Sequence, residues 1–286
     1  MEIGVIFPQT EFSGDAAVIR AYGQAVSELG FAHLAAYDHV LGADPAVHGD
    51  LGGPYTIEDT FHEPLTMFSY LAGCTDLAFA TSILIGPQRQ TALLAKQAAE
   101  VDILSEGRFR LGLGIGWNKV EYDVLGQPFH QRGAILEEQI TLLRLLWTKE
   151  SVTFDGRYTR IKAAGLAPPP VQRPIPIWLG GSAPAALRRV GRLADGWFPM
   201  ARPGGGLEEA LEHIAEGASQ AGRALSDIRF EGRVEWSTRD PEKMSLHAER
   251  WRQAGASHLS VNTMHAGCAS MDDHLGALTT LAQVLL

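Results

Sequence analysis

The chain has 286 residues, of which 45% are hydrophobic and 20% charged, and its formal net charge is −9 at pH 7. This length suits one α/β barrel of about 250 residues or two smaller domains, and the composition is that of a globular protein with a sizeable core. The negative charge argues against a general binder of nucleic acid or of anionic membranes, but it permits a local site for an anionic small ligand.

The two cysteines, Cys74 and Cys268, argue against a secreted protein held together by disulfides. The N-terminal segment MEIGVIFPQT has neither the basic region nor the long apolar run of a signal peptide, and it predicts a strand. No apolar stretch approaches the roughly 18 residues of a membrane span. We therefore expect a cytoplasmic protein with no membrane partner.

Strand-like and helix-like segments alternate along the first half of the chain. Apolar strands are predicted at 2–8, 33–40, 77–86 and 108–116, and helices at 16–31, 65–74, 91–107 and 135–147. Gly30 and Gly107 mark the ends of two of these helices. A long stretch rich in Gly, Pro and His, 41–64, interrupts the pattern, and loops of this length are usually functional or mobile.

The alternation resumes in the second half after an interruption. Residues 151–161 predict a short hairpin, and 167–176 predict an extended Pro-rich connector. Strands are then predicted at 175–181, 196–200, 228–236 and 258–264, and helices at 183–194, 207–222, 240–255 and 271–286. Gly204 to Gly206 predict a flexible loop, and Asp240 an N-cap with Pro241 in the first helical turn.

Eight apolar strands, each followed by a helix, predict parallel βαβ units. Eight such units in a chain of this length indicate a single (β/α)8 barrel domain over residues 1–286. The alternative is an open, doubly wound sheet. In a barrel, the chemistry lies where strands end and βα loops begin. The predicted strand ends are Phe7 to Gln9, Asp38-His39, Ser82-Ile83, Gly114 to Asn118, Gly180 to Ser182, Pro199-Met200, Val234-Glu235 and Asn262-Thr263.

In the segment RFRLGLGIGWNKVEY, residues 108–122, the spacing of the glycines is similar to that of a Gly-rich phosphate loop. The dinucleotide-binding pattern fails, however, because the glycines occur as GxGxG, the strand is the fourth, and no matching acidic residue follows about 20 positions later. The glycines therefore indicate either a flat ligand that approaches the strand closely or tight packing within the barrel.

Two other strand ends carry polar chemistry. Gly180, Gly181 and Ser182 end a strand directly before a helix, so their amides, the hydroxyl and the helix N-terminus favour a phosphate, although Ser182 could equally be an ordinary N-cap. Asp38 and His39 end the second strand. His39 could stabilise an oxyanion or move a proton near neutral pH, or its ring could simply be satisfied by Asp38 or a backbone carbonyl.

The long loop holds His48, Asp50, Asp59, His62 and Glu63, but their spacing matches no standard ligand pattern, and we expect no metal site. Metal-dependent hydrolase barrels need paired histidines after the first strand, where this chain has Phe7-Pro8-Gln9. No GxSxG nucleophile elbow is present.

Several motifs occur together in one order: YDHV, LAFATSILI, LSEGRFRLGLGIGWNKVEY, FDGRYTRI and RPIPIWLGGSAPAALRRVGRLADGWFP. In this the chain resembles the luciferase-like monooxygenase superfamily, and most of all its coenzyme F420-dependent class. The resemblance implies a barrel with an excursion before the fifth strand. It also implies a flavin or deazaflavin at the carboxyl-terminal mouth, with its ring over the third strand.

The resemblance also assigns cofactor-binding residues. Ser82-Ile83 would be a non-proline cis peptide beneath the ring, and Asp38 and His39 would contact the polar edge of the ring. Gly114, Ile115, Gly116, Trp117 and Asn118 would run along the ring and ribityl chain, so that the glycines clear space for the cofactor. Gly180, Gly181 and Ser182 would take the phosphate.

Some F420-dependent sugar dehydrogenases of this superfamily carry a proton-donating glutamate directly after GxGxG, where this chain has Trp117. Sugar-phosphate oxidation is therefore disfavoured, and His39 becomes the main catalytic candidate. The function expected is hydride transfer between F420 and a small organic substrate. The alternatives are an FMN-dependent monooxygenase supplied by a separate reductase, and a carrier protein without turnover. By the same resemblance we expect a homodimer.

Overall fold

The computed structural model describes residues 1–11 and 15–286. Its central sheet is a closed parallel barrel, with the strand order β3-β2-β1-β11-β10-β9-β8-β5-β4 and a β3–β5 pairing that closes the ring. The strands are β1 (Glu2–Ile6), β2 (His33–Ala36), β3 (Ala78–Thr81), β4 (Leu84–Ile85), β5 (Phe109–Gly114), β8 (Ile177–Gly180), β9 (Gly196–Phe198), β10 (Arg229–Glu235) and β11 (His258–Asn262). The predicted (β/α)8 barrel is confirmed.

The third barrel strand is broken into β3 and β4. β3 pairs with β2 and with the start of β5, whereas β4 pairs with the end of β5. The two pieces are separated by Ser82-Ile83, whose peptide bond is cis, as the resemblance implied. At Ser82-Ile83 the third barrel strand is therefore interrupted.

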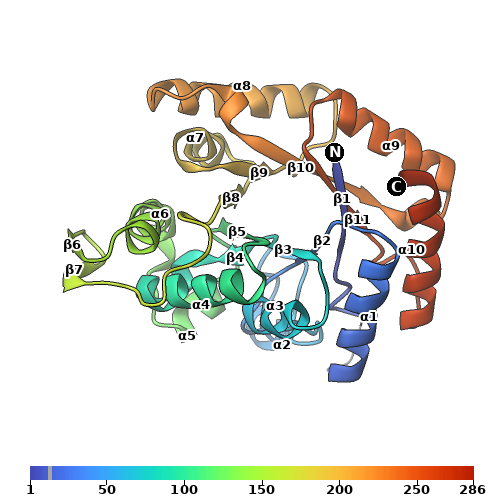
Figure 1. Cartoon of the computed structure of the whole chain (residues 1–286), viewed down its shortest axis with the longest axis horizontal. Helices are drawn as coiled ribbons and strands as arrows, with labels where there is room; N and C mark the ends of the chain where they lie inside the picture. The colour runs from blue at the N-terminus through green and yellow to red at the C-terminus, as the bar shows by residue number, and fades with distance from the viewer. Residues whose placement is uncertain (12–14) are drawn as a thin grey trace.

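Helices surround the barrel (Figure 1). They are α1 (Ala16–Glu28), α2 (Pro45–His48), α3 (Pro64–Ala72), α4 (Thr91–Leu104), α5 (Lys119–Val124), α6 (Arg132–Thr148), α7 (Pro184–Leu193), α8 (Gly205–Gln220), α9 (Pro241–Gln253) and α10 (Met271–Leu285). Asp240 caps α9 by accepting hydrogen bonds from the amides of Glu242 and Lys243, with Pro241 at the first position, as predicted. None of the helices of the described chain is long and apolar enough to cross a membrane.

An antiparallel hairpin, β6 (Val152–Asp155) and β7 (Arg160–Ala164), follows α6 and precedes β8. It projects beyond α6 at the edge of the molecule (Figure 1). The Pro-rich connector then returns the chain to the barrel. This is the excursion expected before the fifth barrel strand. It does not separate the strands on either side of it, because β5 pairs directly with β8.

One local prediction was wrong. Gly204 to Gly206 do not form a flexible loop, because Gly205 already begins α8 and Gly204, with a φ of 132°, is its N-cap. The three glycines indicated a loop, but glycine is also accepted at a helix N-cap. The long stretch 41–64 contains one short helix, α2, whose N-cap is Asp44.

Candidate functional site

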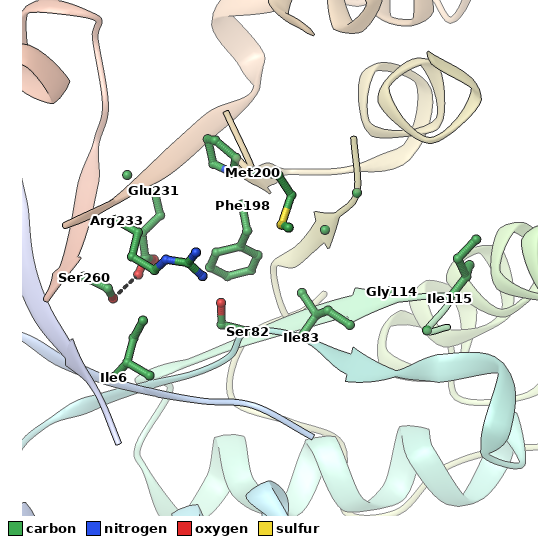
Figure 2. Close-up of a pocket in the computed structure, with 15 residues that line it drawn as sticks. Ile6, Ser82, Ile83, Gly114, Ile115, Phe198, Met200, Glu231, Arg233 and Ser260 are labelled. Atoms are coloured by element: carbon green, nitrogen blue, oxygen red, sulfur yellow. Dashed lines mark hydrogen bonds between the residues drawn. The ribbon is translucent and has the colours of Figure 1, made fainter. Parts of the chain in front are cut away.

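The barrel mouth holds a cleft made of two adjoining cavities, of about 220 and 640 Å³. They share Ser82, Ile83, Gly116, Met200 and Arg233. Figure 2 shows the first cavity, with Ile83, Phe198 and Met200 around an opening above the strands. A concave, mostly apolar cleft of this size at the carboxyl ends of barrel strands suits a cofactor together with a small molecule.

The side chain of Ile83 fills the space beside two glycines. A Cβ on Gly114 would lie 2.4 Å from Cδ1 of Ile83, and one on Gly180 would lie 3.0 Å from its Cγ2. At Gly112 a Cβ would lie 1.8 Å from the carbonyl oxygen of Thr81. The glycines of β5 therefore clear space for the broken third strand, which is the packing alternative. The backbone of Gly114 and Gly116 still lines the cleft.

Gly112→Ala is expected to destabilise the protein by about 1–3 kcal/mol or more, because the added methyl group meets backbone that cannot move aside. Gly114→Ala should cost less, since the end of a flexible isoleucine can give way. Urea unfolding followed by circular dichroism measures both. Gly276→Ala is the control, because a Cβ there meets nothing within 4 Å and should be neutral or stabilising. Equal stability of all three variants would contradict this account.

Gly180 and Gly181 line the first cavity beside the start of α7. The helix begins at Pro184 with Ala183 as its N-cap, and no side chain caps it. Ser182 is therefore not the N-cap and its side chain is exposed. The uncapped N-terminus of α7 beside Gly181 is the kind of site that favours a phosphate.

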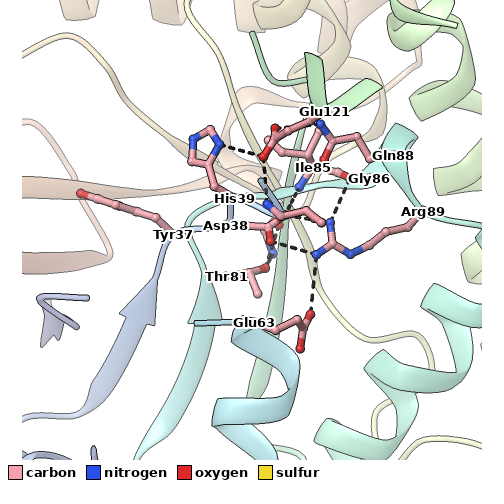
Figure 3. Close-up of polar contacts among 12 residues, drawn as sticks. Tyr37, Asp38, His39, Glu63, Thr81, Ile85, Gly86, Gln88, Arg89 and Glu121 are labelled. Carbon is pink, nitrogen blue, oxygen red and sulfur yellow. Dashed lines mark hydrogen bonds and ion pairs between the residues drawn. The ribbon is translucent and has the colours of Figure 1, made fainter. Parts of the chain in front are cut away.

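The carboxylate of Asp38 is held inside the protein. Its Oδ2 accepts hydrogen bonds from the amide of Ile85 at 2.9 Å and from Nη1 of Arg89 at 2.8 Å, and its Oδ1 accepts from Nη2 of Arg89 at 2.8 Å. Figure 3 shows this pair beneath His39, with Glu63 on the far side of the guanidinium. Asp38 lines the second cavity, but its charge is already matched by Arg89.

His39 projects into the second cavity with its Nδ1 3.1 Å from Oε1 of Glu121 (Figure 3). The same oxygen accepts hydrogen bonds from the amides of Val40 and Leu41, and Oε2 accepts one from Nε2 of Gln88. Burial alone would raise the pKa of Glu121, but the hydrogen bonds from His39, Gln88 and the Leu41 amide hold this pKa below its ordinary value. Glu121 is therefore a carboxylate at neutral pH.

An ionised Glu121 accepts hydrogen bonds and cannot donate them, so Nδ1 of His39 carries the proton. The other nitrogen, Nε2, has no hydrogen-bond partner among residues 1–11 and 15–286. Neutral His39 thus presents an acceptor to the cleft, and protonated His39 presents a donor. This is the arrangement of an oriented general base or acid.

Glu121 was not among the site residues predicted from the sequence. Asn118 caps α5 by accepting from the amides of Val120 and Glu121, which places Glu121 in the first helical turn. That position could be predicted from the sequence, but the contact with His39, 82 residues away, could not. Asn118 itself is buried, and its Nδ2 donates to the carbonyl of Leu41, so this side chain serves the helix start and the loop.

Aromatic rings enclose His39. Its ring centroid lies 5.2 Å from that of Tyr55, 4.8 Å from Phe61 and 5.5 Å from Trp117. Tyr55 and Phe61 belong to the long loop, which therefore packs over the histidine. Rings packed around an imidazole shield it from water.

Two more of the predicted cofactor-binding residues line the cleft. Ile115 lines the first cavity, and Gly116 lines both cavities.

The floor of the first cavity is charged. Glu231 on β10 accepts from Nη1 of Arg110 at 2.9 Å and lies 3.0 Å from Nε2 of His33, and Ser260 donates to it (Figure 2). Burial would raise the pKa of Glu231, but His33 and Arg110 hold it well below its ordinary range. Buried charges of this kind are tolerated because they are paired and hydrogen-bonded.

Fold and cleft together define a (β/α)8-barrel protein with a ligand-sized cleft and an oriented histidine at its carboxyl mouth. More narrowly, the chain belongs to the luciferase-like monooxygenase family, whose model matches residues 1–275. Relatives of this chain include both oxidoreductases and monooxygenases.

Two curated relatives use different cofactors. The chain is 34% identical over 179 residues to an F420-dependent glucose-6-phosphate dehydrogenase of Intrasporangium calvum, covering 58% of this chain and 53% of that protein. It is 33% identical over 172 residues to an FMNH2-dependent dimethylsulfone monooxygenase of Pseudomonas putida, covering 58% and 47%. The matches thus span about half the length of these relatives.

A solved structure of an F420-dependent secondary alcohol dehydrogenase, in complex with an F420-acetone adduct, superposes with a TM-score of 0.76 at 18% identity. The superposition covers 99% of this chain and 98% of that one. At this identity the likeness establishes the fold alone.

Proposed function

We propose that this protein is an F420-dependent oxidoreductase that transfers a hydride between the deazaflavin and a small organic substrate. The observation that supports it best is the His39–Glu121 pair at the edge of a cleft bounded by Ser82-Ile83, with the α7 N-terminus at the other end. Bound F420 would supply the hydride acceptor or donor. The residues of this chain would supply orientation, a proton site and a phosphate site.

The cleft fits such a cofactor in three respects. Ile83, Ile115 and the glycine backbone of β5 offer an apolar bed for a flat ring. Gly181 and Ser182, beside the uncapped α7, offer hydrogen-bond donors to a phosphate. His39 would exchange a proton through Nε2 with the oxygen or nitrogen of the substrate, while Glu121 holds the imidazole in one orientation.

The alternative is an FMN-dependent monooxygenase that receives reduced flavin from a separate reductase. The dimethylsulfone monooxygenase relative favours it, because it matches the same share of this chain as the F420-dependent relative. The same cleft would serve both cofactors, so the identity of the cofactor separates the two functions. A homodimer remains a prediction, which light scattering on the purified protein would test.

Titration of the purified protein with F420 and with FMN is expected to give micromolar or tighter binding of F420 and much weaker binding of FMN. Ser182→Ala should weaken F420 binding about tenfold, which corresponds to about 1.4 kcal/mol for a hydrogen bond to a charged group. Ser219→Ala is the control, because Ser219 is an exposed serine on α8.

Tighter binding of FMN would overturn the F420 proposal and support the monooxygenase. Binding of neither cofactor would overturn both. Tight F420 binding without any turnover on alcohols, ketones, enones or imines would favour a carrier protein.

A further inference from the structure

A third cavity, of about 230 Å³, opens beside the cleft, and we call it the arginine pocket. Its cationic side chains come from three different elements. Arg202 follows β9, Arg233 lies on β10 and Arg250 on α9. His247, Ser237 and Thr238 also line it. A convergence of donors from separate parts of the chain contrasts with the net charge of −9 of the whole protein.

The positive charge of the arginine pocket is not neutralised from within. The only carboxylate that lines it is that of Glu235, among the described residues. Both oxygens of Glu235 are occupied, one by Nε of Arg233 at 2.6 Å and the other by Nδ2 of Asn262 at 2.7 Å. Arg202 and Arg250 form no ion pair with any residue that the structure describes, so two guanidinium groups remain without a counter-charge.

The arginine pocket is continuous with the reaction site. Arg233, Glu235 and Ser237 line both this pocket and the part of the cleft that holds His39. Arg233 is held in place, since its Nη1 donates to the hydroxyl of Tyr37 at 3.2 Å and its Nε to Glu235. Figure 2 shows Arg233 extending over the first cavity beside Phe198. A ligand whose reacting atom lies beside Nε2 of His39 can therefore extend a substituent past Arg233.

We propose that the arginine pocket binds an anionic group of the substrate, namely a carboxylate, a phosphate or a sulfonate. The inference rests on the proposed function for the reaction itself, but anion binding can be tested without it. Guanidinium groups bind such oxyanions through paired, charge-assisted hydrogen bonds. The phosphate of the cofactor would take a different place, at Gly181 and Ser182, neither of which lines this pocket. The substrate class is thus a small molecule with a reducible or oxidisable carbon and an anionic end.

The test is calorimetric titration of the whole protein with F420, and then of the F420-loaded protein with inorganic phosphate, so that the proposed phosphate site at Gly181 and Ser182 is already filled. The pocket variant is Arg202→Gln/Arg250→Gln, in which both side chains are exposed, so that folding should be retained. The matched control is Arg20→Gln/Arg157→Gln, which removes the same charge from exposed positions on α1 and at the hairpin turn. We expect the wild type and the control to bind phosphate alike, the pocket variant to bind it at least tenfold more weakly, and all three to bind F420 equally.

The other outcomes bear separately on the anion site, on the assignment of this site to the substrate, and on the proposed function. No phosphate binding by the wild type, or equal binding by the pocket variant, overturns the anion site. A parallel loss of F420 affinity in the pocket variant overturns the substrate assignment, because the pocket then holds an anionic part of the cofactor. Phosphate binding that depends on the arginines, in a protein that binds no F420, supports the anion site and overturns only the proposed function.

Discussion

The His39→Ala variant is expected to lose about 10²- to 10⁴-fold in kcat, the usual contribution of a positioned general acid or base. Nε2 of His39 is the atom that we place at the reacting end of the cleft. Cofactor affinity should fall far less than kcat, because the residues proposed to hold the phosphate lie elsewhere. Single-turnover kinetics with the substrate found by screening measures the chemical step directly.

Glu121 is a positioning residue in the same experiment. Glu121→Gln should lower kcat with little effect on KM, and Glu121→Asp should recover part of the loss, because it restores the negative charge. Retention of kcat within tenfold in His39→Ala would remove the histidine from the mechanism.

Glu121 also links the site to pH. The pKa of Glu121 is lowered in the folded protein, so the stability it contributes is complete above the ordinary carboxyl pKa of 4.5. This stability is lost as the pH falls through the lowered value. The free energy of unfolding of Glu121→Gln should therefore fall less steeply than that of the wild type as the pH is lowered.

Asp38→Ala is expected to lower the free energy of unfolding by about 3 kcal/mol, because it leaves the largely buried guanidinium of Arg89 without its main partner. It also removes the acceptor for the amide of Ile85, beside the broken third strand. Urea denaturation measures the loss. Asp38→Asn, which keeps an acceptor oxygen, should lose less and serves if the alanine variant does not fold.

Asp155→Ala is the matched control for Asp38→Ala. Asp155 also pairs with an arginine, Arg160, but these two side chains are 84% and 80% exposed. Exposed pairs contribute below about 1 kcal/mol, so this variant should be nearly as stable as the wild type. Similar losses in both variants would show that burial of the Asp38 pair is not what matters.

Much of the fold could be predicted from local pattern. Apolar strands, glycine helix ends and the Asp240-Pro241 start are properties of a few neighbouring residues, and the structure has them where the pattern indicates. The break between β3 and β4 could not be found in this way, because LAFATSILIG is almost continuously apolar, with only Thr81 and Ser82 as polar residues. Only its packing against Gly112 and Gly114 shows why the strand divides there.

The candidate site was partly predictable, for a related reason. A barrel brings strand ends together, so the strand-end residues could be named from the topology. The partners of those residues could not, since Arg89 meets Asp38 across 51 residues and Glu121 meets His39 across 82. The arginine pocket depends on a loop, a strand and a helix at once, and no single segment signals it.

The seat of Ile83 between two glycines has a consequence for how this sequence can vary. Position 83 lies in the break between β3 and β4, positions 114 and 180 lie on the neighbouring strands β5 and β8, and the three share one small volume. A methyl group gained at either glycine must be offset by a smaller side chain at position 83, and a larger residue at 83 requires both glycines. Natural substitutions at these three positions should therefore appear as compensating sets, and the width of the cleft should be inherited with the set.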